Sequence, residues 1–550
     1  MAINTDVFLG SGANLVLVPE TDLYIGLNPA TDGSGSTSTS IVAEADFQNN
    51  YLLVEDIYIG CTVDYYVTGT TTPASTHICT GNSASAITIS PAHGHTEQNG
   101  DFIIIRSYGA PCVGQRYSGS SQVKRLNADN WLGILESATF PDVEVDLKQL
   151  NLSLGTTRNK TFQYKATETA SGGNLNIVAN HGAFLYYAFG NCSEVKATTN
   201  SDHPTNRLTA AAAGDVYIDT GNANDSGEST INTHLNQGPI FYKTGYAATG
   251  TAGTALTPPL LNHLDVHTDV EQLTRPTTTA TAVTAPITYT FTEANGEELP
   301  SFALEQSFSK LETTSTFQTQ DFSAATESHN FVRIARGNRV ESLSMTANEN
   351  EELKMSLTLN SRAVHKLKTD ERYEARGGAG LDNSKLFNFE DTATDAEFLE
   401  PFFFSSGSFN IFGEQFLKIS SLTLNINNTL QDKRFVGIGS KQIKSAIPSE
   451  RTYELSFTAM VTDNALFEEL FNATEQSGES GGTYSNANGL IELLFSKGNT
   501  EEIKLQFKDY HIKTANFTVP DDKGVITVEA TVSPRNLHLC EVKTHWVLQG

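Results

Sequence analysis

Residues 452–461 read Thr-Tyr-Glu-Leu-Ser-Phe-Thr-Ala-Met-Val, and apolar side chains alternate there with mostly polar ones. A period of two places the apolar residues on one face of a β-strand and the polar residues on the other. The same period recurs in residues 353–359, 422–426 and 525–532. These stretches predict strands with one buried face and one wet face. Residues 520–524, Pro-Asp-Asp-Lys-Gly, predict a hairpin turn between two of them.

Helical periodicity is scarce in this chain. Residues 463–473 place four apolar side chains on one helical face behind a potential capping residue, Asp463. Residues 181–190 show a similar pattern and end at Gly190, a typical helix stop. The sequence therefore predicts a mainly β fold in which each β-sandwich carries one short helix.

Four blocks of sequence recur in the same order in two parts of the chain. Collinear recurrence of this kind indicates duplication of one structural unit. The matched blocks are 147–154 with 417–426, 160–162 with 433–435, 183–185 with 465–467, and finally 345–346 with 517–518 followed by 353–364 with 526–537.

This repeat divides the chain into two tandem β-sandwich modules. The first module is expected over 125–368 and carries an insert rich in Thr, Gly and Ala at about 195–300. A linker is expected at 369–399, and the second, compact module at 400–550. Residues 1–124 are β-rich and are expected to form a small barrel inserted in the first module, or an accessory domain.

Charge and composition exclude several classes of function. The chain has 550 residues, with 36 Lys and Arg against 63 Asp and Glu, which gives a net charge of −27. Such a balance disfavours proteins that grip nucleic acid through its phosphates, and also docking on anionic lipid. The five cysteines include no CxxC pair, which favours a reducing compartment over a disulfide scaffold.

Signals for export and for the membrane are also missing from the sequence pattern. The first residues lack the basic and apolar segments of a signal peptide. The longest apolar runs fall far below the ~20 residues of a membrane-spanning helix. We therefore expect a protein made in a cytosol, with no membrane partner.

Three motifs resemble sites of chemistry but do not meet the requirements of those sites. His263 and His267 could share a helical face, but the glutamate of a HExxH protease is absent. Residues 219–228 are rich in oxygen ligands but depart from the calcium-loop pattern. Residues 478–482 spell GxSxG, yet a helical pattern precedes them and a strand pattern follows, the reverse of a nucleophile elbow. No catalytic residue, cofactor or metal is expected, and the chain is predicted not to be an enzyme.

The sequence resembles the tail tube proteins of tailed bacteriophages. The resemblance rests on strand and loop texture rather than on an invariant motif and covers both modules. The segments that carry it are 131–141, 147–164, 409–413, 422–438, 521–530 and 546–550.

The resemblance implies a fold, an assembly and interface residues. Family members are β-sandwiches with a helix, and their sheets join into a continuous barrel around a lumen. Rings stack, and a long loop of one ring contacts the next ring. Here the loops that match are 155–169 and 427–447. The expected ring-to-ring contacts are Arg158, Phe162, Arg434 and Phe435.

The implied function is structural. The chain is expected to polymerise as stacked rings into a tail tube that conducts DNA during ejection, in a virion assembled in the host cytoplasm. Expected partners are further copies of the chain, as trimeric rings with pseudo-sixfold symmetry, and other tail proteins such as the terminator, tape measure or baseplate. Double-stranded DNA would pass transiently and without sequence preference. An acidic lumen, which repels phosphate, is a further hypothesis from the net charge.

Three other readings remain open at this point. The chain could be another tail or capsid protein, such as a terminator, a baseplate hub or a decoration protein. It could be a surface adhesin, which should carry an export signal or anchor. It could be a carbohydrate-active enzyme, which needs two carboxylates at a functional separation. Formation of hollow tubes distinguishes a tail tube protein from another tail or capsid protein.

Overall fold

A computed structural model describes most of the chain. The described residues are 13–20, 23–27, 37–42, 55–67, 70, 72–83, 86–98, 101–111, 134–150, 162–182, 184–197, 216–219, 240–242, 270–272, 287–294, 299–309, 330–367, 400–411, 414–415, 418–433, 445–461, 490–497, 501–521 and 524–544.

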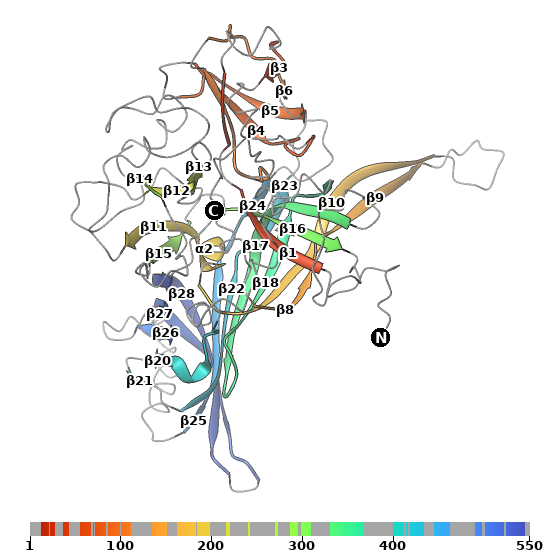
Figure 1. The fold of residues 1–550 in the computed structure, drawn as a ribbon. Helices are drawn as coiled ribbons and strands as arrows, with labels where there is room; N and C mark the ends of the chain where they lie inside the picture. Colours follow the sequence, from red (N-terminus) through yellow and green to blue (C-terminus); the bar gives the residue numbers. More distant parts are fainter. Residues whose placement is uncertain are drawn as a thin grey trace, which may run out of the picture.

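The fold is mainly β, as the alternation predicts, and its centre is one 17-stranded sheet. Eight strands of this sheet pair antiparallel in a continuous run, which we call the shared sheet (Figure 1). In spatial order they are β8 (Ile134–Thr139), β10 (Phe162–Val178), β18 (Lys354–Ser361), β17 (Asn330–Asn348), β22 (Ile419–Asn427), β25 (Thr452–Met460), β28 (Thr527–Thr544) and β27 (Glu501–Thr518).

The long strands β17, β27 and β28 continue beyond the shared sheet into two outer groups of strands. The first group has the order β1–β16–β17–β19, and the second has the order β20–β26–β27–β28. β15 pairs with the end of β28, and β11 pairs with β15. The remaining bounds are β1 (Ala13–Pro19), β16 (Phe302–Ser309), β19 (Ala363–Leu367), β20 (Gly407–Ile411), β21 (Glu414–Gln415), β26 (Ile491–Lys497), β15 (Ile287–Glu293) and β11 (Gly190–Ala197).

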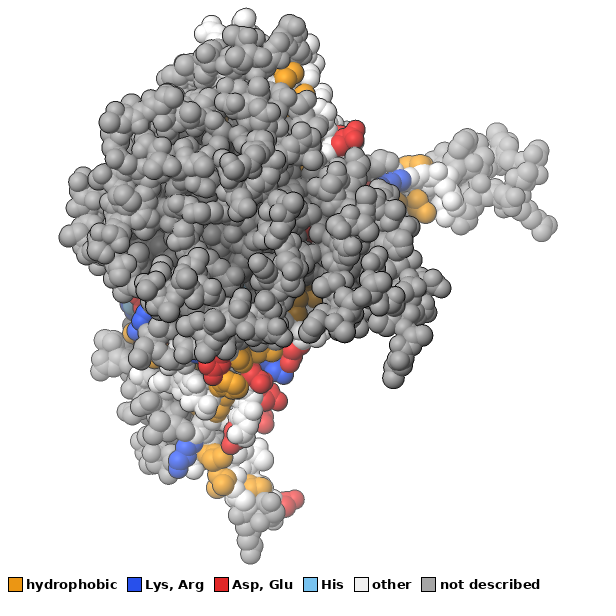
Figure 2. Space-filling model, viewed as in Figure 1, with side chains coloured by type: hydrophobic (Ala, Val, Ile, Leu, Met, Phe, Trp, Pro, Cys, Tyr) orange, Lys and Arg blue, Asp and Glu red, His pale blue; other side chains and the backbone are white. Residues whose placement is uncertain are grey.

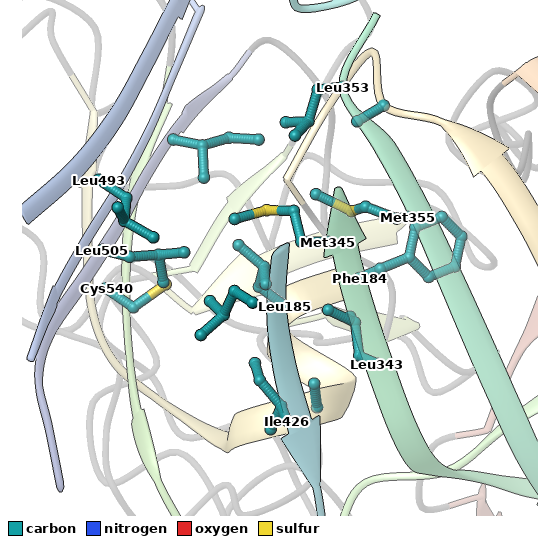
Figure 3. Packing of buried hydrophobic residues seen from close by; sticks show 14 of the residues in the cluster. Phe184, Leu185, Leu343, Met345, Leu353, Met355, Ile426, Leu493, Leu505 and Cys540 are labelled. Atoms are coloured by element: carbon teal, nitrogen blue, oxygen red, sulfur yellow. The ribbon is translucent and has the colours of Figure 1, made fainter. Parts of the chain in front are cut away.

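A single apolar core fills the space between the shared sheet and the outer strands. Helix α2 (Phe184–Phe189) lies inside this core with all six side chains buried, and its Leu185 lies among residues of both layers (Figure 3). The helix confirms the pattern seen in residues 181–190. Gly190 follows it with φ +103°, a conformation that favours glycine. The second predicted helix, 463–473, lies outside the described residues.

The residues between β1 and β8 form a separate six-stranded sheet. Its order is β2–β7–β4–β5–β6–β3. Its core is shared with the first outer group, because Ala303, Val332, Ile334 and Leu367 belong to the same apolar cluster. The strands are β2 (Leu23–Gly26), β3 (Ser40–Val42), β4 (Thr62–Tyr66), β5 (Ser75–Asn82), β6 (Ala86–Ser90) and β7 (Phe102–Ile105).

Smaller elements complete the described part of the chain. The insert around 195–300 contains a three-stranded sheet of β12 (Val216–Asp219), β13 (Ile240–Tyr242) and β14 (Val270–Gln272). β23 (Leu430–Lys433) and β24 (Ser445–Pro448) pair with each other, and a short 3-10 turn spans Phe404–Ser406. None of the helices described has the length and hydropathy needed to cross a membrane.

Two buried arginines connect the six-stranded sheet to the sandwich. Arg336 donates from Nη1 to the Gly109 carbonyl at 2.9 Å and from Nη2 to the Ile59 carbonyl at 2.8 Å. Arg362 donates to the Tyr108 carbonyl at 2.8 Å. Gly109 has φ +74°, and a Cβ there would lie 2.8 Å from the Arg362 guanidinium, so only glycine fits.

The buried carboxylate of Glu20 completes this junction. It accepts the Gly337 N–H at 2.6 Å, the Gly109 N–H at 2.9 Å and the Ser301 hydroxyl. Burial raises the pKa of Glu20 above its ordinary value, although these hydrogen bonds and Arg336 oppose the shift. The junction therefore holds charged groups that only their mutual contacts make tolerable inside the protein.

A buried histidine, His181, and a partly buried one, His365, make the stability of the subunit depend on pH. Burial lowers the pKa of His181 and of His365 from 6.5 to about 3, and for His365 the neighbouring Arg336 adds to the effect. Below pH 6.5 the unfolded chain binds protons that the folded chain does not. Stability present at neutral pH is therefore lost as the pH falls from 6.5 toward 3, by about 2 kcal/mol per histidine at pH 5.

We expect a His181→Gln variant to lose about 2 kcal/mol less than the parent between pH 7 and pH 5. Urea unfolding of dilute subunits at the two pH values measures this difference. His95 is exposed, and His95→Gln is the matched control substitution. An identical pH dependence in His181→Gln and the parent would contradict the assignment.

Candidate assembly surface

The shared sheet consists of two groups of four strands in the same spatial order. One group is β8–β10–β18–β17 and the other is β22–β25–β28–β27. Within each group, the first two strands in the chain are followed by the last and then the penultimate strand. The outer groups β1–β16–β17–β19 and β20–β26–β27–β28 also correspond in order.

Two irregularities in the pairing fall at the same steps of both groups. One residue is skipped between β8 and β10 at Glu136, and one is skipped between β22 and β25 at Ser420. The β17–β18 hairpin skips Glu341, and the β27–β28 hairpin skips Lys513. A bulge is a defined local feature, so two coincidences of position indicate a common architecture.

A hydrogen bond outside the ladders also recurs. The Ala179 N–H donates to the Leu353 carbonyl at 2.7 Å, and the Val461 N–H donates to the Ile526 carbonyl at 2.9 Å. The sequence matches 183–185 with 465–467 and 353–364 with 526–537 place these residues at corresponding positions. The sequence matches and these two hydrogen bonds therefore indicate the same correspondence between the two strand groups.

One sequence match has the wrong register. The match of 147–154 with 417–426 predicts that these segments occupy equivalent strands, but the pairing places β8 in the position of β22. β9 (Asp142–Leu150) instead pairs with the first half of β10 as a projecting arm (Figure 1). The mismatch arises because short amphipathic strands with the same period resemble one another.

The two groups meet through β17 and β22, which pair from Ser342↔Asn427 to Asn348↔Ser421. The outermost strands of the shared sheet are β8 and the second half of β27. Among the strands described, β8 pairs only with β10, and residues 510–518 of β27 pair only with β28. Each end of the shared sheet therefore presents an edge to further pairing.

The β27–β28 hairpin exposes apolar side chains at this edge. Phe517, Val519 and Ile526 are 38%, 71% and 41% exposed. Figure 2 shows hydrophobic side chains along this lower arm and along the β9–β10 arm. At the corresponding positions of the β17–β18 hairpin the side chains are fully buried, since β22 and residues 400–404 lie beside them. Those residues are Met345, Ala347 and Leu353.

The other face of the shared sheet carries mainly uncharged polar groups. Hydroxyl and amide side chains alternate with the buried residues along its strands, for example Ser344, Thr346, Thr423 and Asn425. Charged side chains on this face include two ion pairs: Lys354 with Glu136 at 2.8 Å and Lys513 with Glu454 at 2.7 Å. The Glu136 carboxylate raises the pKa of Lys354.

The residues predicted as ring contacts fall mostly outside the described part of the chain. This holds for Arg158, Arg434 and Phe435, so their contacts stay a prediction. Phe162 begins β10 opposite Leu150 at the far end of the β9–β10 arm, and its side chain lies outside the described residues.

Sequence reasoning missed the exposed tip of the β27–β28 hairpin. Its signal was present, since apolar residues continue the strand alternation up to Val519 and resume at Val525. The motifs at 263–267 and 478–482 lie outside the described residues. Among the described residues, His, Cys, Asp and Glu side chains form no group of three or more that could hold a metal ion.

Two strand groups of the same order, a shared core and two open edges among the described strands define a β-sandwich protein of the kind that associates edge to edge. The chain belongs to the phage tail tube protein family, whose model matches residues 153–533. The match covers both strand groups of the shared sheet apart from β8 and residues 534–544 of β28. The comparison with curated proteins finds no match to the chain. Family membership identifies a structural component of the phage tail that assembles with copies of itself and with other tail proteins.

Proposed function

We propose that this chain closes into rings that stack into the tail tube, the conduit for double-stranded DNA during ejection. The observation that carries the proposal is the β17–β22 pairing, in which one strand group already joins the next through its edge. The corresponding edges of the shared sheet, at β27 and at β8, have no partner among the strands described. A head-to-tail contact of this type generates a ring when its rotation closes.

The proposal includes two copies of one module within the chain. The first copy comprises β1, residues 134–189 and residues 302–367, and the second comprises residues 400–550. Matching strand order, matching bulges and the recurrent hydrogen bond support this division. On this view the six-stranded sheet is an insertion in the first copy between β1 and β8, and residues 190–293 are a second insertion.

The spacing of strands requires at least three chains in each ring. Eight strands per chain at ~4.8 Å give a barrel about 37 Å across at the backbone for three chains, and about 24 Å for two. Side chains occupy about 5 Å on each wall. Groove depths of about 8 Å on either side imply a DNA rod at least about 16 Å across, which passes through the ring of three but not the ring of two.

The polar face of the shared sheet lines the bore in this arrangement. Hydroxyl and amide groups predominate on the described wall, the charges of two ion pairs neutralise each other, and Glu529 adds an exposed carboxylate. We therefore propose a polar lumen that carries little of the net charge of −27. A wall without a cationic cluster offers no site for counterion release, so DNA can slide without being held.

Electron microscopy of the purified chain tests the proposed function. We expect hollow tubes or stacked rings with sixfold features, and a ring mass of three chains. Native mass spectrometry of isolated rings gives the chain count independently. A protein that stays monomeric across salt and concentration would overturn the proposal, and a ring of six chains would overturn the pseudo-sixfold arrangement.

A further inference from the structure

The joint between β17 and β22 provides a residue-level template for contact between chains. β17 corresponds to β27, because Thr346 pairs with Lys354 as Thr518 pairs with Thr527. β22 corresponds to β8, because each strand has one residue that is skipped in its pairing with the next strand, Ser420 in β22 and Glu136 in β8. Carrying the β17–β22 register across these correspondences gives one register for β27 against β8.

We propose that β27 of one chain pairs antiparallel with β8 of the next chain, with Thr518 opposite Thr139. This inference rests on the proposed ring and specifies its joint. The register also places Phe517 opposite Phe140 and Val519 opposite Ala138. The template joint likewise sets Thr346 opposite Thr423, so both joints contain a threonine pair on the polar face.

Backbone chemistry supports this register. In the template, the Glu349 N–H donates to the Ser420 carbonyl at 2.8 Å, so odd-numbered residues of β17 turn their N–H groups toward β22. N–H direction alternates along a strand. The corresponding residues of β27 that face the next chain are therefore Ala515, Phe517 and Val519.

The two prolines near the joint fit the same register. Pro520 corresponds to Asn348, and Pro141 corresponds to Asn425. Both positions direct their backbone nitrogen away from the joint, toward the neighbouring strand of the same chain. A proline lacks an N–H, so it is compatible with an edge only at such positions.

Side-chain burial identifies the occupant as a second copy of this chain. Val519 is 71% exposed, whereas Ala347 at the corresponding template position is 0% exposed beside its neighbouring strand β22. Ala138 of β8 is exposed as well, although Leu422 at its template position is buried. Within the chain, the β17–β22 pairing buries the side chains that correspond to Val519 and Ala138. Pairing of β27 with β8 of a second chain would bury these two side chains in the same way.

Disulfide trapping tests the register. Residues directly opposite at a non-hydrogen-bonded position lie about 4.5 Å apart at Cα, within disulfide range. In assembled protein, Thr518→Cys with Thr139→Cys is expected to cross-link chains into covalent dimers and trimers on mild oxidation. Thr346→Cys with Thr423→Cys is the internal control and gives a disulfide within one chain.

Two comparisons keep the test specific. Thr518→Cys with Ser137→Cys shifts the pair by two residues and is expected to cross-link at most a tenth as fast. Each single variant measures the background from native cysteines. Rings that form without the Thr139–Thr518 cross-link, or with faster cross-linking to residue 137, overturn this register but leave the proposed function intact. Absence of rings in the uncross-linked parent overturns the proposed function itself.

Discussion

An Ala515→Pro variant is expected to remain folded but to lose ring and tube formation. Ala515 lies on the edge strand β27, and its N–H faces the next chain in the proposed joint. Proline removes this donor and leaves the pairing with β28 in place, because the opposite side of the strand makes those bonds. One lost hydrogen bond with an unsatisfied partner costs about 1.4 kcal/mol, or tenfold, per joint.

The loss multiplies around a ring. Three joints at tenfold each lower the association constant of the ring by about a thousandfold, which raises the concentration needed for half assembly by about thirtyfold. Sedimentation velocity across a concentration series measures the threshold, and circular dichroism on heating checks that the subunit is folded. Ala515→Val keeps the N–H and favours a strand, so it is the matched control that still assembles. Normal tubes from a folded Ala515→Pro protein would exclude β27 as the joint.

An Arg336→Met variant is expected to lose about 3–5 kcal/mol of folding stability. The Arg336 side chain is fully buried, and its guanidinium satisfies carbonyls of Gly109 and Ile59 and donates to His365 at 2.8 Å. Methionine fills similar space but leaves these acceptors without their donor. The Glu20 carboxylate also loses the charge of Arg336, which opposes the rise in its pKa.

The controls separate geometry from charge at this junction. Arg336→Lys keeps the charge but lacks the planar fork, so we expect it to recover less than half of the loss. Arg333→Met removes a partly exposed arginine three residues earlier on β17 and is expected to cost about 1 kcal/mol or less. Urea unfolding gives the free energies, and limited proteolysis shows whether residues 23–111 are released first. Equal costs for Arg336→Met and Arg333→Met would contradict the structural role of the junction.

Local pattern was sufficient for much of the fold. The alternation in 452–461 predicts β25, the Pro-Asp-Asp-Lys-Gly turn predicts the β27–β28 hairpin, and the apolar pattern in 181–190 predicts α2. The sequence match of 345–346 with 517–518 agrees with the structure, because these residues occupy equivalent positions in the β17–β18 and β27–β28 hairpins. The bulge and the turn of each hairpin fix which residues face the core.

Long-range pairing was beyond the reach of local pattern. β1 pairs with β16 almost three hundred residues later, and β15 pairs with the end of β28. The pattern of an amphipathic strand does not specify which strand it pairs with, since many strands have the same period and similar faces. The misaligned block at 147–154 failed for this reason.

The assembly surface was hidden for a related reason. Val519 and Ala347 have the same place in the strand pattern, yet one is exposed and the other is buried. Sequence alternation indicates which face is apolar but not whether the covering strand comes from the same chain. Only the comparison of two strand groups in one structure distinguishes an internal joint from an open edge.

A density map of the assembled tube, detailed enough to separate strands, tests the duplicated sheet and its closure most directly. The result we predict is a ring of three chains in which β27 of each chain continues into β8 of its neighbour, so that six similar strand groups surround one bore. A ring in which the second half of β27 borders solvent, or in which the two strand groups of a chain occupy non-equivalent places around the axis, would contradict it.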